Sequence, residues 1–231
     1  MNNFFVRLFS GVIYISLIAG SILYNQYSFI IICSFLFFIA EIECHRLWLK
    51  ILQKASNPVY PIPQWKKRSQ LYPIPQLFVG ISFLLLISIP YGGWAYNEIY
   101  NPYSILLIFV LIWISDTMSY VIGVQFGKNK ISTKVSPNKT WEGFFGGLLF
   151  CLIFSILSFN YIQEIYPFWK TILLGLLIPI FAIIGDMTQS KLKRKAGVKN
   201  SGILIPGHGG VYDRLDSTIG VAPIAFIITM I

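Results

Sequence analysis

Residues 185–216 read GDMTQSKLKRKAGVKNSGILIPGHGGVYDRLD, and this polar stretch joins two apolar segments. One acid, Asp186, stands at its start, and two more, Asp213 and Asp216, stand at its end. Between the acids lies a basic loop that tightens at a glycine-rich turn, residues 207–210. Carboxylate oxygens suit a hard divalent cation, whereas Lys, Arg and backbone N–H groups suit phosphate. The stretch therefore predicts a metal-assisted phosphate site at a membrane surface.

The composition of the whole chain also indicates a membrane protein. Of the 231 residues, 55% are hydrophobic and only 12% are charged, whereas charged residues make up about a quarter of a soluble domain. The net charge of +9 raises the alternative of nucleic-acid binding. However, the basic residues form short clusters between apolar runs, without an aromatic-interleaved basic domain. We therefore expect a polytopic membrane protein and no nucleic-acid partner.

Continuous apolar runs predict an all-α fold, because a transmembrane barrel would show alternating strands instead. The first run begins like a signal peptide but lacks a convincing cleavage site, so we interpret it as a span. The three cysteines show no CxxC spacing and are interpreted as packed free thiols. We expect a transmembrane helical bundle of about seven spans, near residues 8–24, 28–44, 77–90, 103–124, 142–159, 171–187 and 217–231.

The distribution of Lys and Arg orients this bundle. Of the 18 basic residues, 17 fall before the first span or in the loops 45–76, 125–140 and 188–215. Lys170 is the only basic residue in the intervening turns. Because basic loops stay on the cytoplasmic side, the alternation predicts a cytoplasmic N-terminus and cytoplasmic catalytic loops.

The N-terminal part offers weaker signals. The segment 56–76 surrounds a basic patch at 65–68 with five prolines, which fits either an extended segment against anionic headgroups or a solvated connector. Glu41 and Glu43 lie near the end of the second span, and we interpret them as interface residues beside Arg46 rather than functional ones. A single membrane-embedded domain is expected over 1–231, with N-terminal helices and this loop in 1–100 and a catalytic core in 103–231.

Asp116 lies within the otherwise apolar fourth run. A bare charge at that depth is costly, so its side chain should face the bundle interior and find a partner. A purely structural ion pair with a nearby Lys is the alternative. Because the fourth and sixth runs cross the membrane in the same direction, Asp116 and Asp186 can converge in its cytoplasmic half.

The sequence SPNKTWEGFFGG, residues 136–147, combines turn, cap and packing signals. Ser136, Pro137 and Asn138 predict a turn, and Thr140 predicts the N-cap of the fifth helix. Lys139 is a cation that could reach phosphate. The glycines at 143, 146 and 147 favour close helix packing over close approach of a ligand.

The residues after Asp186 predict a helix that continues past the membrane and stops at Gly197. Asp213 and Asp216 are spaced i, i+3, which favours one face in the first turn of the last helix. The preceding turn, His208–Gly210, offers unhindered backbone N–H groups, and Arg214 offers a bidentate phosphate donor. A simple helix cap does not account for all of these features.

These residues resemble a known family. Ser190, Lys193-Arg194, Lys199 and PGHGGVYDRLD closely resemble the signature of the phosphatidate cytidylyltransferases, also called CDP-diacylglycerol synthases. The stretches SDTMSYVIGVQFGKNK and SPNKTWEGFFGG are similar to the family's other shared segments, so the resemblance covers roughly residues 110–220.

The resemblance implies a polytopic, dimeric enzyme of the bacterial inner membrane that transfers CMP from CTP to phosphatidic acid. Its cofactor would be Mg²⁺, with or without a second cation. By position, Asp186 and Asp213 resemble metal ligands, and Asp216 resembles a catalytic acid. Lys193 and Arg194 would bind substrate and assist catalysis. The candidate substrate-binding residues are Ser190, Lys199, His208, Gly209, Gly210, Arg214, Asn138, Lys139 and Asp116.

Two departures from the family pattern stand out. Asn200 follows Lys199 where the family usually has Asp, and the chain is shorter than many relatives, chiefly towards its N-terminus. Only 15 residues follow Asp216, about 22 Å of helix against a hydrocarbon core of about 30 Å.

The alternatives to this enzyme are another CTP-using membrane lipid kinase, a CDP-alcohol phosphatidyltransferase, whose Asp-Gly-rich signature is missing, and a cation-coupled transporter.

Overall fold

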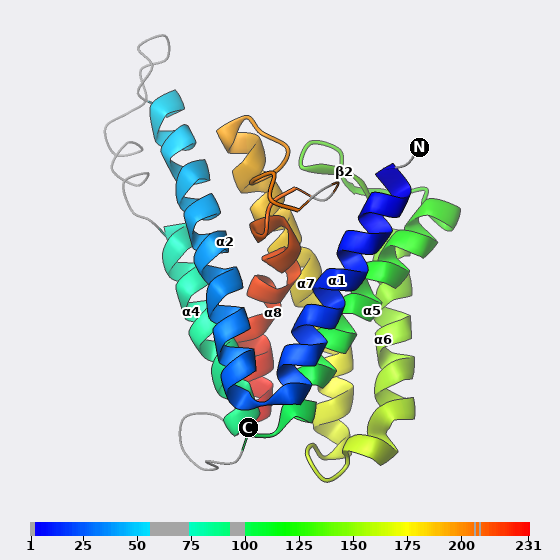
Figure 1. The fold of residues 1–231 in the computed structure, drawn as a ribbon. Helices are drawn as coiled ribbons and strands as arrows, with labels where there is room; N and C mark the ends of the chain where they lie inside the picture. Colours follow the sequence, from blue (N-terminus) through cyan, green and yellow to red (C-terminus); the bar gives the residue numbers. More distant parts are fainter. Residues whose placement is uncertain (1–2, 56–73, 93–99, 206, 208) are drawn as a thin grey trace.

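A computed structural model describes residues 3–55, 74–92, 100–205, 207 and 209–231. Within these residues the chain forms a bundle of seven α-helices (Figure 1), and each predicted apolar run coincides with one of them, which confirms the all-α bundle. The helices are α1 (Asn3–Tyr24), α2 (Gln26–Ala55), α4 (Ile74–Ser88), α5 (Pro102–Phe126), α6 (Trp141–Ile162), α7 (Phe168–Ala196) and α8 (Tyr212–Met230).

Most of these helices have the length and composition of membrane spans. In the described part of the chain, five are long and apolar enough to cross a bilayer: α2, α4 with its 3-10 extension η1 (Ile89–Tyr91), α5, α6 and α7. The apolar part of α1 is shorter, and α8 carries three charged residues in its first two turns. The chain is therefore an integral membrane protein.

Helix α8 lies within the bundle, where it packs against α7, α4 and α2. Figure 1 shows the C-terminal end of α7, strand β2 (Ser136–Thr140) and the N-terminal end of α1 at the same end of the bundle. The turn between α6 and α7 and the C-terminus of the chain lie at the opposite end. The described parts of the basic loops 125–140 and 188–215 thus share one end.

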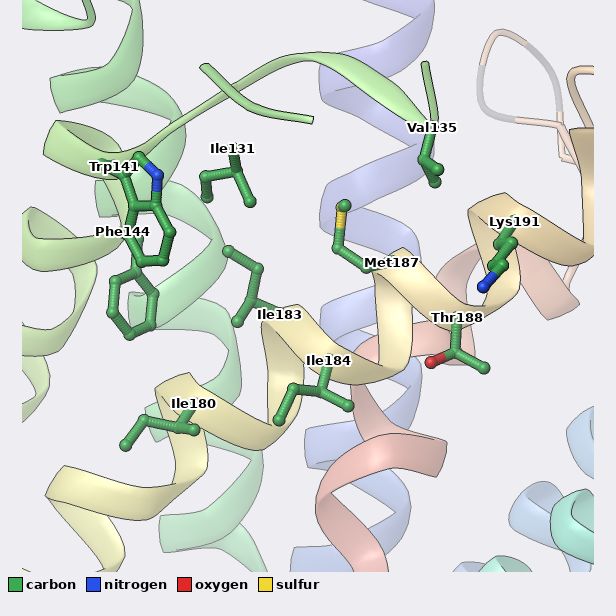
Figure 2. Close-up of a pocket in the computed structure, with 10 residues that line it drawn as sticks. All are labelled: Ile131, Val135, Trp141, Phe144, Ile180, Ile183, Ile184, Met187, Thr188 and Lys191. Atoms are coloured by element: carbon green, nitrogen blue, oxygen red, sulfur yellow. The ribbon is translucent and has the colours of Figure 1, made fainter. Parts of the chain in front are cut away.

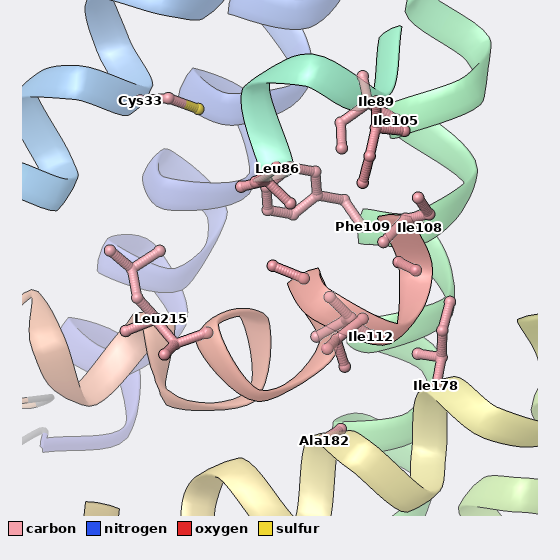
Figure 3. Packing of buried hydrophobic residues seen from close by; sticks show 14 of the residues in the cluster. Cys33, Leu86, Ile89, Ile105, Ile108, Phe109, Ile112, Ile178, Ala182 and Leu215 are labelled. Carbon is pink, nitrogen blue, oxygen red and sulfur yellow. The ribbon is translucent and has the colours of Figure 1, made fainter. Parts of the chain in front are cut away.

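Figure 3 shows the apolar core that fixes α8 in this position. Phe109 of α5 is buried there, and Leu215 of α8 is 1% exposed. Within a bilayer, close van der Waals packing of such side chains holds the helices together, because lipid is as apolar as the core. Around them pack Leu86, Ile89, Ile105, Ile108, Ile112, Ile178 and Ala182.

The cysteines behave as the sequence predicts. Cys33, Cys44 and Cys151 are free and buried, and the Cys151 thiol donates to the carbonyl of Leu111 on the neighbouring helix. They contribute to packing between helices.

Local capping signals are also confirmed. The Thr140 hydroxyl accepts a hydrogen bond from the Gly143 N–H at 3.2 Å and so caps α6. Helix α7 continues past the apolar run and ends at Gly197, whose φ of 77° is the left-handed conformation that glycine adopts without strain. The glycines of α6 pack against α5, because a Cβ on Gly143 would lie 2.5 Å from the Ser119 carbonyl oxygen.

The turn predicted at residues 136–138 is wrong. These residues belong to strand β2 (Ser136–Thr140), which pairs antiparallel with β1 (Lys130–Ser132), and the turn lies at 133–135. Pro137 tolerates this position because a strand of a two-stranded ribbon has an unpaired edge. The ribbon brings Lys139 to the start of α6.

The Pro-rich segment falls largely on residues 56–73, outside the described residues, so its lipid contact stays a prediction.

Helices α7 and α8 approach closely at a pair of glycines. A Cβ on Gly185 would lie 2.5 Å from the Asp216 carbonyl oxygen and 2.9 Å from the Cα of Gly220. We expect Gly185→Ala to lower the free energy of unfolding by about 1–3 kcal/mol, because the helices must separate. Thermal unfolding in detergent measures this loss.

The matched control is Gly80→Ala on α4, where the added Cβ would have no heavy atom of the described residues within 4 Å. Its stability should stay the same or rise slightly, since Ala loses less backbone entropy in a helix than Gly. Equal stability of the two variants would contradict the close contact between α7 and α8.

Candidate active site

Asp186 lies in α7, nearly three turns before the helix ends at Ala196. Its Oδ2 forms an ion pair with the ammonium of Lys139 from β2, and its Oδ1 accepts a hydrogen bond from the Ser190 hydroxyl at 3.1 Å. The Lys139 and Asp186 side chains are each about a quarter exposed. The structure thus brings three predicted site residues together from the ribbon and α7.

A second ion pair joins α7 to the start of α8. The Lys193 ammonium lies 2.6 Å from Asp213 Oδ1, and both side chains are less than 10% exposed. The other oxygen, Oδ2, accepts hydrogen bonds from the backbone N–H groups of Ser201 at 2.8 Å and Gly210 at 3.0 Å. Asp213 therefore holds both the preceding loop and the preceding helix.

Asp116, Asp186 and Asp216 form a group of acids from α5, α7 and α8. Asp216 lies close enough to both other carboxylates for electrostatic repulsion, which Lys193 partly offsets. Asp116 accepts a hydrogen bond from the Ser217 hydroxyl at 3.2 Å and interacts favourably with Lys139. The predicted convergence of Asp116 with Asp186 is consistent with this arrangement.

The glycine-rich turn is folded back on itself. Ile205 and Gly209 exchange two backbone hydrogen bonds. Gly209 has a φ of 98°, and a Cβ there would lie 2.6 Å from Asp213 Oδ2. Only glycine fits this backbone against the carboxylate. Asn200 lies beside it, because the same Cβ would lie 3.3 Å from the Asn200 side chain. His208 lies outside the described residues, so its role stays a prediction.

The remaining predicted binding residues surround these pairs less closely. Arg194 is exposed and donates to the Val198 carbonyl at 3.1 Å, and Lys199 and Asn138 are also exposed. The Nε of Arg214 is buried without a hydrogen-bond partner among the described residues. A buried donor without a partner is costly, and an anionic ligand would satisfy it.

Glu43 is the residue that the sequence reasoning missed. Its side chain is 2% exposed, and its carboxylate accepts hydrogen bonds from the Ser201 hydroxyl at 2.7 Å, the Tyr212 N–H at 3.0 Å and the Val211 N–H at 3.3 Å. Its buried carboxylate therefore lies against the start of α8 and the loop that precedes it, and not beside Arg46 at an interface as predicted. The signal that could have identified Glu43 is the one applied to Asp116: an acid inside an apolar run requires a partner.

Two apolar cavities flank α7 beside these charges. The first, of about 530 Å³, lies between the ribbon, α6 and α7, with Trp141 and Phe144 on one side and Met187 and Lys191 on the other (Figure 2). The second, of about 330 Å³, lies between α4, α7 and α8 and includes Asp216 among its lining residues. Apolar space thus reaches the acidic group.

The donor chemistry of the site fits a hard cation, although the described residues contain no cluster of three or more His, Cys, Asp or Glu side chains arranged for a metal. Asp186 and Asp213 each bind a lysine ammonium instead. These pairs show that the carboxylates attract cations, and oxygen donors are those that Mg²⁺ prefers. The assignment of Asp186 and Asp213 as metal ligands stays a prediction.

The fold and the site define a class of protein: an integral membrane helical bundle with acids, lysines and apolar cavities at one end. The sequence profile of the cytidylyltransferase family matches residues 76–231. The chain belongs to the cytidylyltransferase family.

Similar proteins bear a more specific name. Over 156 residues the chain is 38% identical to a phosphatidate cytidylyltransferase of Staphylococcus haemolyticus. It is 36% identical to the proteins of that name in Staphylococcus saprophyticus and Staphylococcus aureus. The matched segment covers 65% of this chain and 60% of each relative, so the match spans less than two thirds of those curated relatives. The resemblance seen in the sequence is confirmed.

Proposed function

We propose that this protein transfers CMP from CTP to phosphatidic acid, giving CDP-diacylglycerol and pyrophosphate, as a step of phospholipid biosynthesis. Its membership of the cytidylyltransferase family and the name of its relatives support the proposal. The observation that carries it is the buried Lys193–Asp213 pair together with an apolar cavity that reaches Asp216, three residues further along α8. Such a site can hold an anionic headgroup and acyl chains together.

In the proposed reaction, a phosphate oxygen of phosphatidic acid attacks the α-phosphorus of CTP. The new oxygen–phosphorus bond forms as the bond to the β-phosphate breaks, and pyrophosphate leaves. Because the attacking phosphate is already anionic, no strong general base is needed. Positioning and charge neutralisation then account for most of the catalysis.

The cations of the site would neutralise the transferred and departing phosphates. Lys193 and Lys139 form ion pairs with Asp213 and Asp186, respectively. The Nε of Arg214 is buried and has no hydrogen-bond partner in the described part of the chain. Arg194 and Lys199 are exposed at the rim, where they can meet pyrophosphate. Asp116, Ser190 and the Gly209–Gly210 backbone would position the substrates, and His208 and Asn138 are further candidates.

Asp186 and Asp213 would hold the divalent cation, which we propose to be Mg²⁺, alone or with a second cation. When bound, the cation would screen the charges of the two phosphates from each other. Asp216 would act as a further acid beside them.

The cavity between α4, α7 and α8 is our candidate for the lipid chains. Phe78 and Ile184 line it and are about half exposed, so the cavity opens towards the side of the bundle. A phosphatidate entering sideways would bring its phosphate towards Asp216 and its acyl chains towards the bilayer. Apolar pockets with few polar groups are typical of such ligands.

The purified protein should make CDP-diacylglycerol from phosphatidic acid and CTP. With CTP labelled in cytosine, the label should enter the lipid, whereas label in the γ-phosphate should leave in pyrophosphate. Thin-layer chromatography of the extracted lipid measures the first label, and chromatography of the aqueous phase measures the second. Transfer of the γ-label to phosphatidic acid or a polyprenol would instead show a CTP-using lipid kinase and contradict the proposal.

The comparisons do not favour a kinase or a cation-coupled transporter. We further propose that the site faces the cytoplasm of a bacterial inner membrane, because CTP is cytosolic and basic loops tend to stay on the cytoplasmic side of a membrane. The homodimer implied by the resemblance, and the division into N-terminal helices and a catalytic core, also remain proposals.

A further inference from the structure

Helix α8 begins without a cap of its own. Its N-cap residue, Val211, has no side chain that can accept a hydrogen bond. The first N–H groups of a helix need acceptors when they are buried, and both Val211 and Tyr212 are buried. The acceptor comes from a different helix, because both N–H groups donate to the Glu43 carboxylate of α2.

Glu43 also reaches Asp213 through a single intermediate residue. Ser201 donates its hydroxyl to Glu43 Oε2 at 2.7 Å and its backbone N–H to Asp213 Oδ2 at 2.8 Å. Both carboxylates thus accept a hydrogen bond from Ser201. Tyr212, whose N–H is bound by Glu43, directly precedes Asp213 and has its carbonyl bound by the Gln189 amide at 2.6 Å.

The neighbouring glycines show how closely the loop fits around Glu43. A Cβ on Gly202 or on Gly210 would collide with the Glu43 carboxylate. The described loop residues therefore approach this carboxylate from several sides. Glu43 lies outside residues 76–231, the part of the chain that matches the family profile.

We propose that Glu43 is a positioning residue for the reaction: it fixes the start of α8 and Ser201, and through them the Asp213 carboxylate. This inference rests on the proposed function for the role of Asp213. In this role Glu43 acts through the Ser201 side chain and the α8 backbone that it holds.

The test compares Glu43→Gln with Glu41→Gln, which lies on the same helix outside these contacts. Glutamine has the same size, but its NH₂ group must face one of the three donors. We expect Glu43→Gln to lower kcat by about 10–100-fold, as is typical of residues that orient a metal ligand. The Mg²⁺ concentration for half-maximal rate should rise about tenfold, whereas the KM for CTP should change little.

Ser201→Ala provides a milder variant, because it removes one hydrogen bond to Glu43 and keeps the Ser201 N–H on Asp213. Its kcat should fall severalfold, with the same shift in Mg²⁺ dependence. Glu41→Gln should behave as the wild type. A merely structural Glu43 would lower the amount of folded enzyme but leave the Mg²⁺ dependence unchanged, and that result would overturn the proposal.

A readout without activity is hydrogen exchange of the purified, metal-free protein. The amides of Val211 and Tyr212 should exchange faster in Glu43→Gln than in the wild type, while those of α6 stay equally protected. Unchanged exchange at 211 and 212 would contradict the role of Glu43 whatever the enzyme does. A wild type that makes no CDP-diacylglycerol would instead overturn the proposed function, and the exchange rates would still decide whether Glu43 holds α8.

Discussion

Replacing Asp213 by Asn should lower the turnover number on the order of a hundredfold or more, because charge screening at a metal site contributes several kcal/mol to the transition state. The structure adds a second reason. Asp213 accepts from Lys193 through Oδ1 and from the Ser201 and Gly210 N–H groups through Oδ2. Asparagine has one oxygen, so it can keep the loop contacts only by turning its NH₂ group towards the Lys193 ammonium. Initial rates over a range of Mg²⁺ concentrations measure the loss.

Asp186→Asn should behave similarly, and the double variant should fall little further than either single one, because residues that act through one ion are not additive. The control is Glu164→Gln, an exposed acid in the turn between α6 and α7. It should stay near the wild-type rate. A folded Asp213→Asn with near-normal turnover at limiting Mg²⁺ would show that this carboxylate only caps and anchors α8.

Lys193→Met should cause the largest loss of stability, about 3–5 kcal/mol, because it leaves the buried Asp213 carboxylate without its cation. Both side chains of this pair are less than 10% exposed. Methionine fills much the same space as the lysine stem, so the change removes charge rather than packing. Denaturant or thermal unfolding in detergent measures the loss, and turnover should fall with it.

The matched stability control is Lys139→Met, which breaks the more exposed pair with Asp186. A partly exposed pair contributes about 1 kcal/mol or less, so the loss should be much smaller. Combining Lys193→Met with Asp213→Asn removes both charges, and this double variant should regain stability without regaining activity. If Lys193→Met is no less stable than Lys139→Met, the Lys193–Asp213 pair is not buried as described.

Sequence patterns that depend on nearby residues predicted the fold well. Apolar runs located all seven described helices, because a continuous apolar run is a local signal that needs no knowledge of distant contacts. Thr140 and Gly197 marked helix ends because caps need particular side chains or backbone angles. The exception is Ser136–Asn138, where turn residues form a strand because the partner strand supplies hydrogen bonds that local preference does not include.

The candidate site was predictable in its residue types but not in its pairing. The acids and lysines were evident in the sequence, yet no spacing shows that Lys139 binds Asp186 or that Lys193 binds Asp213. These pairs depend on how α5, α6, α7 and α8 pack. Glu43 was misjudged for the same reason, because its partner Ser201 lies 158 residues away.

That separation has a consequence for how the protein is made. Helix α2 leaves the ribosome long before α8, and the Tyr14 hydroxyl of α1 bonds the Arg214 carbonyl over an even longer interval of 200 residues. Contacts between such distant segments form late, since the intervening chain must be closed first. The early helices are therefore in the bilayer before α8, and the Glu43 carboxylate lacks its three hydrogen-bond donors until α8 inserts. Insertion of α8 completes the site, and a nascent chain stalled after α7 would lack it.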